Sequence, residues 1–287
     1  MISLENVSLR YRRTVALDDV SLTIGDGVIC GVLGRNGSGK TSLLSLIAAW
    51  RRPSGGSVRV LGENPYENPR VMSQVAMVLD RSEAENPLSV KETLKMAALF
   101  RPNWDAAYAD RLLRLFELPA KKSVASLSKG KAAALRCVVG LAARTPVTIY
   151  DEAYLGLDAA YRKLFITELL EDFTNNPRTV LLSTHFIGEM ENIFSEALIL
   201  DGGRLMAHED CDALRARGTT VAGMSDAVQA FVDGKNVLSR RAIGNQSEAI
   251  LFGALDPKDR AEAARLGLSL GGAPLQELVI AMTGKEE

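Results

Sequence analysis

Gly34-Arg35-Asn36-Gly37-Ser38-Gly39-Lys40-Thr41 is the stretch that decides the fold, because it matches G-x-x-x-x-G-K-[ST] at every fixed position. The apolar run 28–33 before it predicts a buried strand, and residues 42–50 after it predict a helix. The glycines let successive backbone N–H groups converge on phosphate oxygens, and the helix N-terminus adds its positive dipole end. Lys40 supplies a cation for β- and γ-phosphates, and the Thr41 hydroxyl is a Mg²⁺ ligand. The stretch therefore predicts a nucleotide phosphate loop, with a chance glycine-rich turn as the alternative.

A second candidate feature is the apolar run 146–150, which predicts a strand that ends in the carboxylates Asp151 and Glu152. The carboxyl ends of strands in an open parallel sheet face the ligand crevice. Asp151 is the candidate to hold Mg²⁺, directly or through water, and Glu152 the candidate to polarise an attacking water. The alternative is a solvated turn without a chemical role.

Three further motifs agree with these two in order and spacing. Leu127-Ser128-Lys129-Gly130-Lys131 places Ser128 23 positions before Asp151; Gly156-Leu157-Asp158 follows Glu152; Ser183-Thr184-His185 ends another apolar strand. With these motifs the chain resembles the nucleotide-binding subunits of ATP-binding cassette (ABC) transporters over about residues 1–215. The run 100–105 and the Ser-Lys-Gly signature resemble bacterial export-type systems that handle peptides or antibiotics.

The resemblance implies roles for individual residues. Tyr11 would stack on adenine, although an ordinary exposed aromatic is the alternative. Ser128 and Gly130 would belong to the signature loop, which touches the γ-phosphate bound by the partner subunit. Asp158 would lie in the loop that crosses the dimer interface. His185 would contact the γ-phosphate and the attacking water as the switch histidine.

The chain departs from the family pattern at three positions. Asp80 stands where a glutamine usually contacts Mg²⁺ and water, so we expect it either to serve the metal through water or to point to solvent. Lys131 lies in the signature, either near the partner's phosphate or in solvent. Ala153 replaces a proline and removes no catalytic group. The second histidine, His208, lacks a motif, and we expect it at the surface.

Composition excludes several classes of protein. The chain has 287 residues, 47% of them hydrophobic, and a net charge of −1, which argues against nucleic-acid binding as the main function. Cys30, Cys137 and Cys211 show neither disulfide nor metal spacing, which favours a reducing compartment. We expect no signal peptide, because the N-terminus is already strand-like. No apolar run reaches the length of a transmembrane helix, so a transporter would need a separate membrane chain.

The expected fold class is α/β, a P-loop NTPase of the ABC type. Residues 1–216 would form the ATPase domain, with a helical subdomain at about 88–143. Residues 217–287 would form a small α+β accessory domain, because strand, helix, strand, strand, helix, strand is the ferredoxin-like order. A final helix is expected at 274–282.

These features predict an ATPase subunit that uses ATP and Mg²⁺ to drive a separate membrane permease in export of a peptide, antibiotic or similar compound. Because one cassette is present, a second ATPase subunit, identical or homologous, must complete the sites. The expected location is the cytoplasmic face of the cell membrane, reached through the permease, and no nucleic-acid partner is expected. Two alternatives stay open: a soluble ABC ATPase not coupled to transport, and a nucleotide-dependent regulator with weak hydrolysis.

Overall fold

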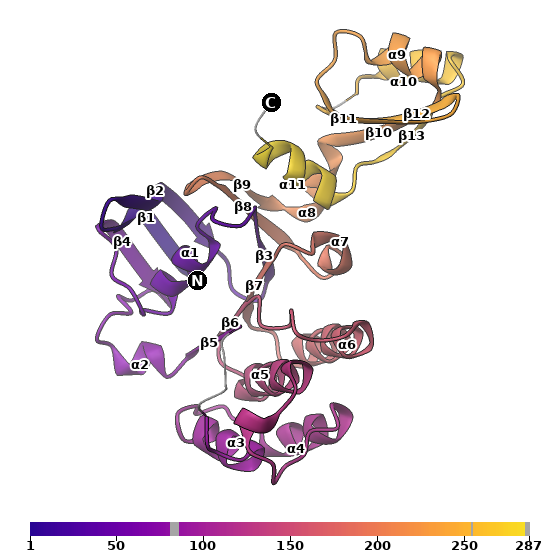
Figure 1. Cartoon of the computed structure of the whole chain (residues 1–287). Coiled ribbons are helices and arrows are strands. Elements are labelled where there is room, and N and C mark those ends of the chain that lie inside the picture. The colour runs from indigo at the N-terminus through magenta and orange to yellow at the C-terminus, as the bar shows by residue number, and fades with distance from the viewer. Residues whose placement is uncertain (81–85, 254, 285–287) are drawn as a thin grey trace.

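The computed structural model describes residues 1–80, 86–253 and 255–284, and a six-stranded sheet forms its centre (Figure 1). The strand order is β5-β6-β7-β3-β8-β9, parallel except for the antiparallel edge strand β9. β3, β6 and β7 are buried along their whole length, as expected for a parallel sheet covered on both faces. The strands are β3 (Ile29–Leu33), β5 (Val75–Leu79), β6 (Val147–Asp151), β7 (Thr179–Thr184), β8 (Glu196–Asp201) and β9 (Arg204–Asp210).

A three-stranded antiparallel sheet of order β2-β1-β4 covers one side of the centre. Its strands are β1 (Ile2–Tyr11), β2 (Thr14–Ile24) and β4 (Gly55–Val60). Helix α1 (Lys40–Ile47) follows the phosphate loop, two residues earlier than predicted, and shares an apolar core with both sheets. This core fixes the phosphate loop between β3 and α1.

The helices expected between 88 and 143 are present and form a separate group beside the central sheet (Figure 1). They are α3 (Val90–Leu99), α4 (Ala106–Leu115) and α5 (Lys129–Ala143), with a 3₁₀ turn at Val124–Ser126. A capping box begins α3: the Ser89 side chain accepts from the Glu92 N–H, and the Glu92 carboxylate accepts from the Ser89 N–H. The other helices of residues 1–216 lie outside this group; they are α2 (Pro69–Met72), α6 (Ala159–Asn175), α7 (Ile187–Met190) and α8 (Cys211–Ala216).

The tail has the strand and helix order that the sequence predicts. Its sheet order is β11-β12-β10-β13, and all neighbours are antiparallel, which is the arrangement of a ferredoxin-like unit. A small core that includes Val221, Phe231 and Leu251 fills the space under the helices. The elements are β10 (Gly218–Met224), α9 (Ser225–Val232), β11 (Val237–Ile243), β12 (Gln246–Phe252), α10 (Pro257–Arg265) and β13 (Ser269–Gly272).

The last helix, α11 (Leu275–Thr283), packs back on α7 and α8 of the first 216 residues (Figure 1). The Leu275 N–H donates to Glu191 Oε2 at 2.9 Å, and the Gly188 N–H donates to Gln276 Oε1 at 3.0 Å. The fully buried Leu278 joins the apolar core under α7. The tail thus has its own sheet and core, yet its final helix belongs to the surroundings of α7, the segment that follows His185.

Candidate functional site

The phosphate loop has a backbone that only glycine adopts at low cost. Gly34, Gly37 and Gly39 have φ of 143°, 82° and 106°. A Cβ on Gly34 would lie 2.3 Å from the Leu200 carbonyl oxygen, and one on Gly39 would lie 2.7 Å from that of Ala16. Side chains at these two positions would therefore both strain the backbone and clash with neighbouring backbone, so the curled loop requires the glycines.

Lys40 is buried at the start of α1, only 6% exposed. Its Nζ donates to the carbonyl oxygens of Gly34 at 2.8 Å and Arg35 at 2.9 Å, which leaves one ammonium donor beyond these two bonds. Burial lowers the pKa of Lys40, and the nearby carboxylates of Glu152 and Asp151 oppose that shift. The ammonium therefore lies in the electrostatic range of both candidate carboxylates.

A buried hydroxyl that has no partner among the described residues shows that the loop has a donor for a phosphate group. Ser38 Oγ is buried and, within residues 1–80, 86–253 and 255–284, has no hydrogen-bond partner, although a buried hydroxyl normally has one. Arg35, Asn36 and Thr41 are exposed. A phosphate oxygen would satisfy the Ser38 hydroxyl, and Thr41, in the first turn of α1, is available to an ion on that phosphate.

The two carboxylates are tied together by a residue to which sequence analysis gave no role. Ser183, paired with Asp151 across β6 and β7, donates its hydroxyl to Asp151 Oδ1. The same Oγ accepts from the Glu152 N–H at 3.1 Å. Asp151 is 6% exposed, and Glu152 has a φ of 51°, which is unusual for a residue with a side chain. Ser183 therefore stabilises the turn after β6, in which Glu152 leaves the extended backbone conformation that Asp151 still has as the last residue of the strand.

His185 meets Glu152 at the end of the neighbouring strand. Its Nδ1 lies 2.9 Å from Glu152 Oε1, and the two side chains are 35% and 28% exposed. The ring packs on Phe186, with centroids 4.3 Å apart. A partly solvated carboxylate in contact with imidazole is a suitable general base with an orienting partner.

Tyr11 lies at the end of β1 and is 39% exposed. Its hydroxyl is 3.4 Å from Ser42 Oγ on α1, and the Arg51 guanidinium lies 5.6 Å from the ring centroid. The ring is thus beside the helix that follows the phosphate loop, with surface left for another flat group.

The signature segment does not meet the phosphate loop in these contacts; it caps α5. Ser128 accepts from the Lys131 N–H, and Gly130 lies close to Gly156, where a Cβ would be 3.3 Å from the Gly156 carbonyl oxygen. Lys131 does not lie free in solvent, which is one of the two positions expected for it. Its Nζ donates to the Phe116 carbonyl at 2.9 Å and the Tyr161 hydroxyl at 2.7 Å, so this lysine joins α5 to α4 and α6.

Asp80 follows β5 and pairs with α5 of the helical group. Asp80 Oδ1 lies 2.6 Å from the Arg136 guanidinium; the Asp80 side chain is 35% exposed and that of Arg136 is 9% exposed. The Asp80 carboxylate therefore has a cationic partner on α5, so its side chain does not simply point to solvent.

His208 is not at the surface as expected. Its side chain is 15% exposed, and its Nε2 lies 3.0 Å from Glu196 Oε2. No local pattern predicts this contact, because the antiparallel pairing of β8 and β9 brings the two residues together.

Comparison with known proteins points to the same family as the sequence motifs. The family model described as ABC transporter matches residues 17–155. The chain is 28% identical over 215 residues to ABC transporter ATP-binding protein YtrB of Bacillus subtilis (strain 168), over 75% of this chain and 74% of the relative. It is 32% identical over 213 residues to Nod factor export ATP-binding protein I of Cupriavidus pinatubonensis, and this match covers 72% of this chain and 65% of the relative. A solved ATP-binding subunit of an ABC transporter superposes with a TM-score of 0.68 at 25% identity, over 75% of this chain and 92% of that one.

Proposed function

From the match of residues 17–155 to the ABC transporter family and the similarity to ATP-binding proteins of such transporters, we propose that the chain powers a separate membrane permease by hydrolysing ATP. The observation that carries the proposal is the Glu152–His185 pair, which stands in the electrostatic surroundings of Lys40 at the phosphate loop. Export of a peptide, antibiotic or similar compound is the finer proposal. It rests on the signature and on the similarity to a relative named for Nod factor export.

The described side chains divide the work of hydrolysis. Lys40 and the loop amides hold the phosphates and offset charge that grows in the transition state. Glu152 accepts the proton of the attacking water, and His185 holds the Glu152 carboxylate in place through Nδ1. Thr41 and Asp151 are the proposed Mg²⁺ ligands, with Asp80 as a third candidate. Bound Mg²⁺ would supply positive charge beside the phosphates.

A second ATPase subunit is the first proposed partner. Ser128 is exposed, and Gly130 is half-buried beside Gly156, so the signature segment of one subunit is available to the nucleotide of another. Asp158 is exposed and caps α6 by accepting from the Tyr161 N–H at 2.9 Å. The partner is either a second copy or a homologue.

The permease is the second proposed partner, and a groove at the helical group supports it. Its volume is about 370 Å³, and its lining includes the exposed Trp50, Met96 and Phe100. The lining also includes Arg136, the partner of Asp80, so the groove adjoins the Asp80–Arg136 ion pair. No helix in residues 1–80, 86–253 and 255–284 has the length and hydropathy to cross a membrane. The proposed location is the cytoplasmic face of the membrane, held there by a permease bound in this groove.

We expect the chain to co-purify with a permease from detergent-solubilised membranes, and Phe100→Ser to lose that association while keeping basal ATP hydrolysis. Phe100 is 64% exposed and lines the groove. The matched control is Ile243→Ser, which changes an 84% exposed apolar residue of the tail. If no membrane protein co-purifies with the unaltered chain, the permease proposal fails. If Phe100→Ser retains the permease as Ile243→Ser does, the groove is not the permease-binding surface.

Magnesium dependence tests the third metal candidate. If Asp80 leaves Arg136 to serve the ion, Asp80→Asn should need more Mg²⁺ for half-maximal hydrolysis and should bind Mg²⁺-free ATP better, since a charge near the γ-phosphate is gone. Arg136→Gln also breaks the 2.6 Å ion pair but keeps the carboxylate, so it should not raise the Mg²⁺ requirement. Equal Mg²⁺ titrations for both variants and the unaltered chain would restrict Asp80 to holding the helical group.

A further inference from the structure

A cluster of three possible metal ligands lies in the central sheet, away from the phosphate loop. Cys30 is on β3, Glu196 on β8 and His208 on β9. Cys30 and Glu196 are direct partners in the β3–β8 register, while His208 is the partner of Leu198, two residues beyond Glu196. Since side chains alternate along a strand, this register places all three on one face of the sheet.

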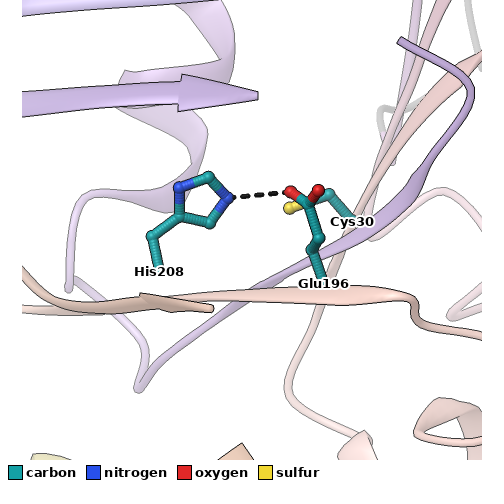
Figure 2. A group of neighbouring side chains, drawn as sticks. All are labelled: Cys30, Glu196 and His208. Atoms are coloured by element: carbon teal, nitrogen blue, oxygen red, sulfur yellow. Dashed lines mark hydrogen bonds and ion pairs between the residues drawn. The ribbon is translucent and has the colours of Figure 1, made fainter. Parts of the chain in front are cut away.

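The side chains converge on a common point (Figure 2). One ligand atom of each residue, the Cys30 sulfur, a Glu196 oxygen and a His208 nitrogen, lies within 4.8 Å of the other two. The Glu196 Oε2 to His208 Nε2 distance is 3.0 Å. Metal–ligand bonds of about 2.0–2.3 Å put the ligand atoms of a tetrahedral ion about 3.5 Å apart. The observed spacing requires only small side-chain rotations to reach that value.

The surroundings suit an ion held by three protein ligands. Cys30 is fully buried, whereas the side chains of Glu196 and His208 are 25% and 15% exposed. The site is therefore closed on the sulfur side and open to water on the other, which leaves a position for a solvent ligand. On the same face the next pair towards the phosphate loop is Val32 and Leu198, both fully buried. This apolar pair separates the cluster from Gly34.

We propose that Cys30, Glu196 and His208 form a binding site for one Zn²⁺ ion. Thiolate and imidazole together favour Zn²⁺ over Mg²⁺ and Ca²⁺, which prefer oxygen ligands. On binding, the Cys30 thiol gives up its proton to solvent and the sulfur takes the metal. The ion would link β3, β8 and β9. It would thereby stiffen β3, in which Cys30 lies four residues before Gly34, the first residue of the phosphate loop.

Cobalt(II) is a suitable probe, because a thiolate ligand gives Co²⁺ an intense charge-transfer absorption. In nucleotide-free buffer without Mg²⁺, the full chain should take up one Co²⁺ with that absorption and release it to an equivalent of Zn²⁺. Cys30→Ser should lose the absorption, and Cys137→Ser should keep it, because Cys137 is another buried cysteine that lies outside the cluster. The test contains no ATP, so its failure leaves the ATPase proposal intact.

His208→Gln gives a second test through a partly exposed residue, should Cys30→Ser fail to fold. We expect it to weaken Co²⁺ binding by roughly 100-fold or more, beyond the loss seen when a ligand's supporting contact is removed. Zn²⁺ should also raise the thermal midpoint of the unaltered chain and of Cys137→Ser, but not of His208→Gln. The proposal is overturned if the unaltered chain shows no thiolate absorption, or if Cys30→Ser or His208→Gln binds Co²⁺ as the unaltered chain does.

Discussion

Replacing Glu152 with glutamine should lower ATP hydrolysis by roughly 10²- to 10⁴-fold while leaving ATP binding intact, the usual worth of a positioned general base. Glutamine has nearly the shape of glutamate, so the turn at φ 51° and the Ser183 bond to the backbone N–H should persist. The amide also keeps a polar contact with His185 Nδ1. What is lost is the ability to accept a proton from water.

Single-turnover hydrolysis separates this loss from any loss of binding. ATP affinity should be unchanged by calorimetry, and gel filtration with ATP should show an accumulated dimer, because hydrolysis no longer ends the closed state. Glu189→Gln is the matched control, since Glu189 is a nearby, half-exposed glutamate that pairs with Arg162 rather than with His185. A near-normal single-turnover rate in Glu152→Gln would remove Glu152 from the catalytic role.

Sequence predicts the parts of the site that a single segment specifies. The phosphate loop depends on glycines at fixed spacing, and its left-handed residues are Gly34, Gly37 and Gly39 as that spacing requires. The helix at 90–99 depends on the Ser89–Glu92 capping box, which is likewise local. The six-residue strand that leads to His185 depends on an apolar run between turn signals. In these three cases the structure of the segment is determined by residues that are neighbours in the sequence.

The missed features all depend on side chains that meet across elements. Ser183 supports Asp151 and Glu152 because β6 and β7 pair in one register. The Lys131 ammonium finds a carbonyl and a phenol on other helices, and Arg136 reaches across from α5 to Asp80. The His208 imidazole lies opposite Glu196 only once β8 and β9 form a hairpin. Strand register and helix packing decide such contacts, and the hydrophobic pattern of a single segment does not specify them.

The second large effect concerns binding: Lys40→Ala should weaken ATP binding by roughly 10- to 150-fold, because a hydrogen bond to a charged group contributes about 1.5–3 kcal/mol. The side chain is already ordered beside the loop, where it donates to the carbonyls of Gly34 and Arg35, so little ordering cost remains when phosphate arrives. AMP lacks the β- and γ-phosphates that the ammonium would contact, and its affinity should change little. Calorimetry with ATP and AMP measures both quantities, with the exposed Lys91→Ala on α3 as the control and circular dichroism as the check of folding. An unchanged ATP affinity in folded Lys40→Ala would show that residues 34–41 do not hold the β- and γ-phosphates.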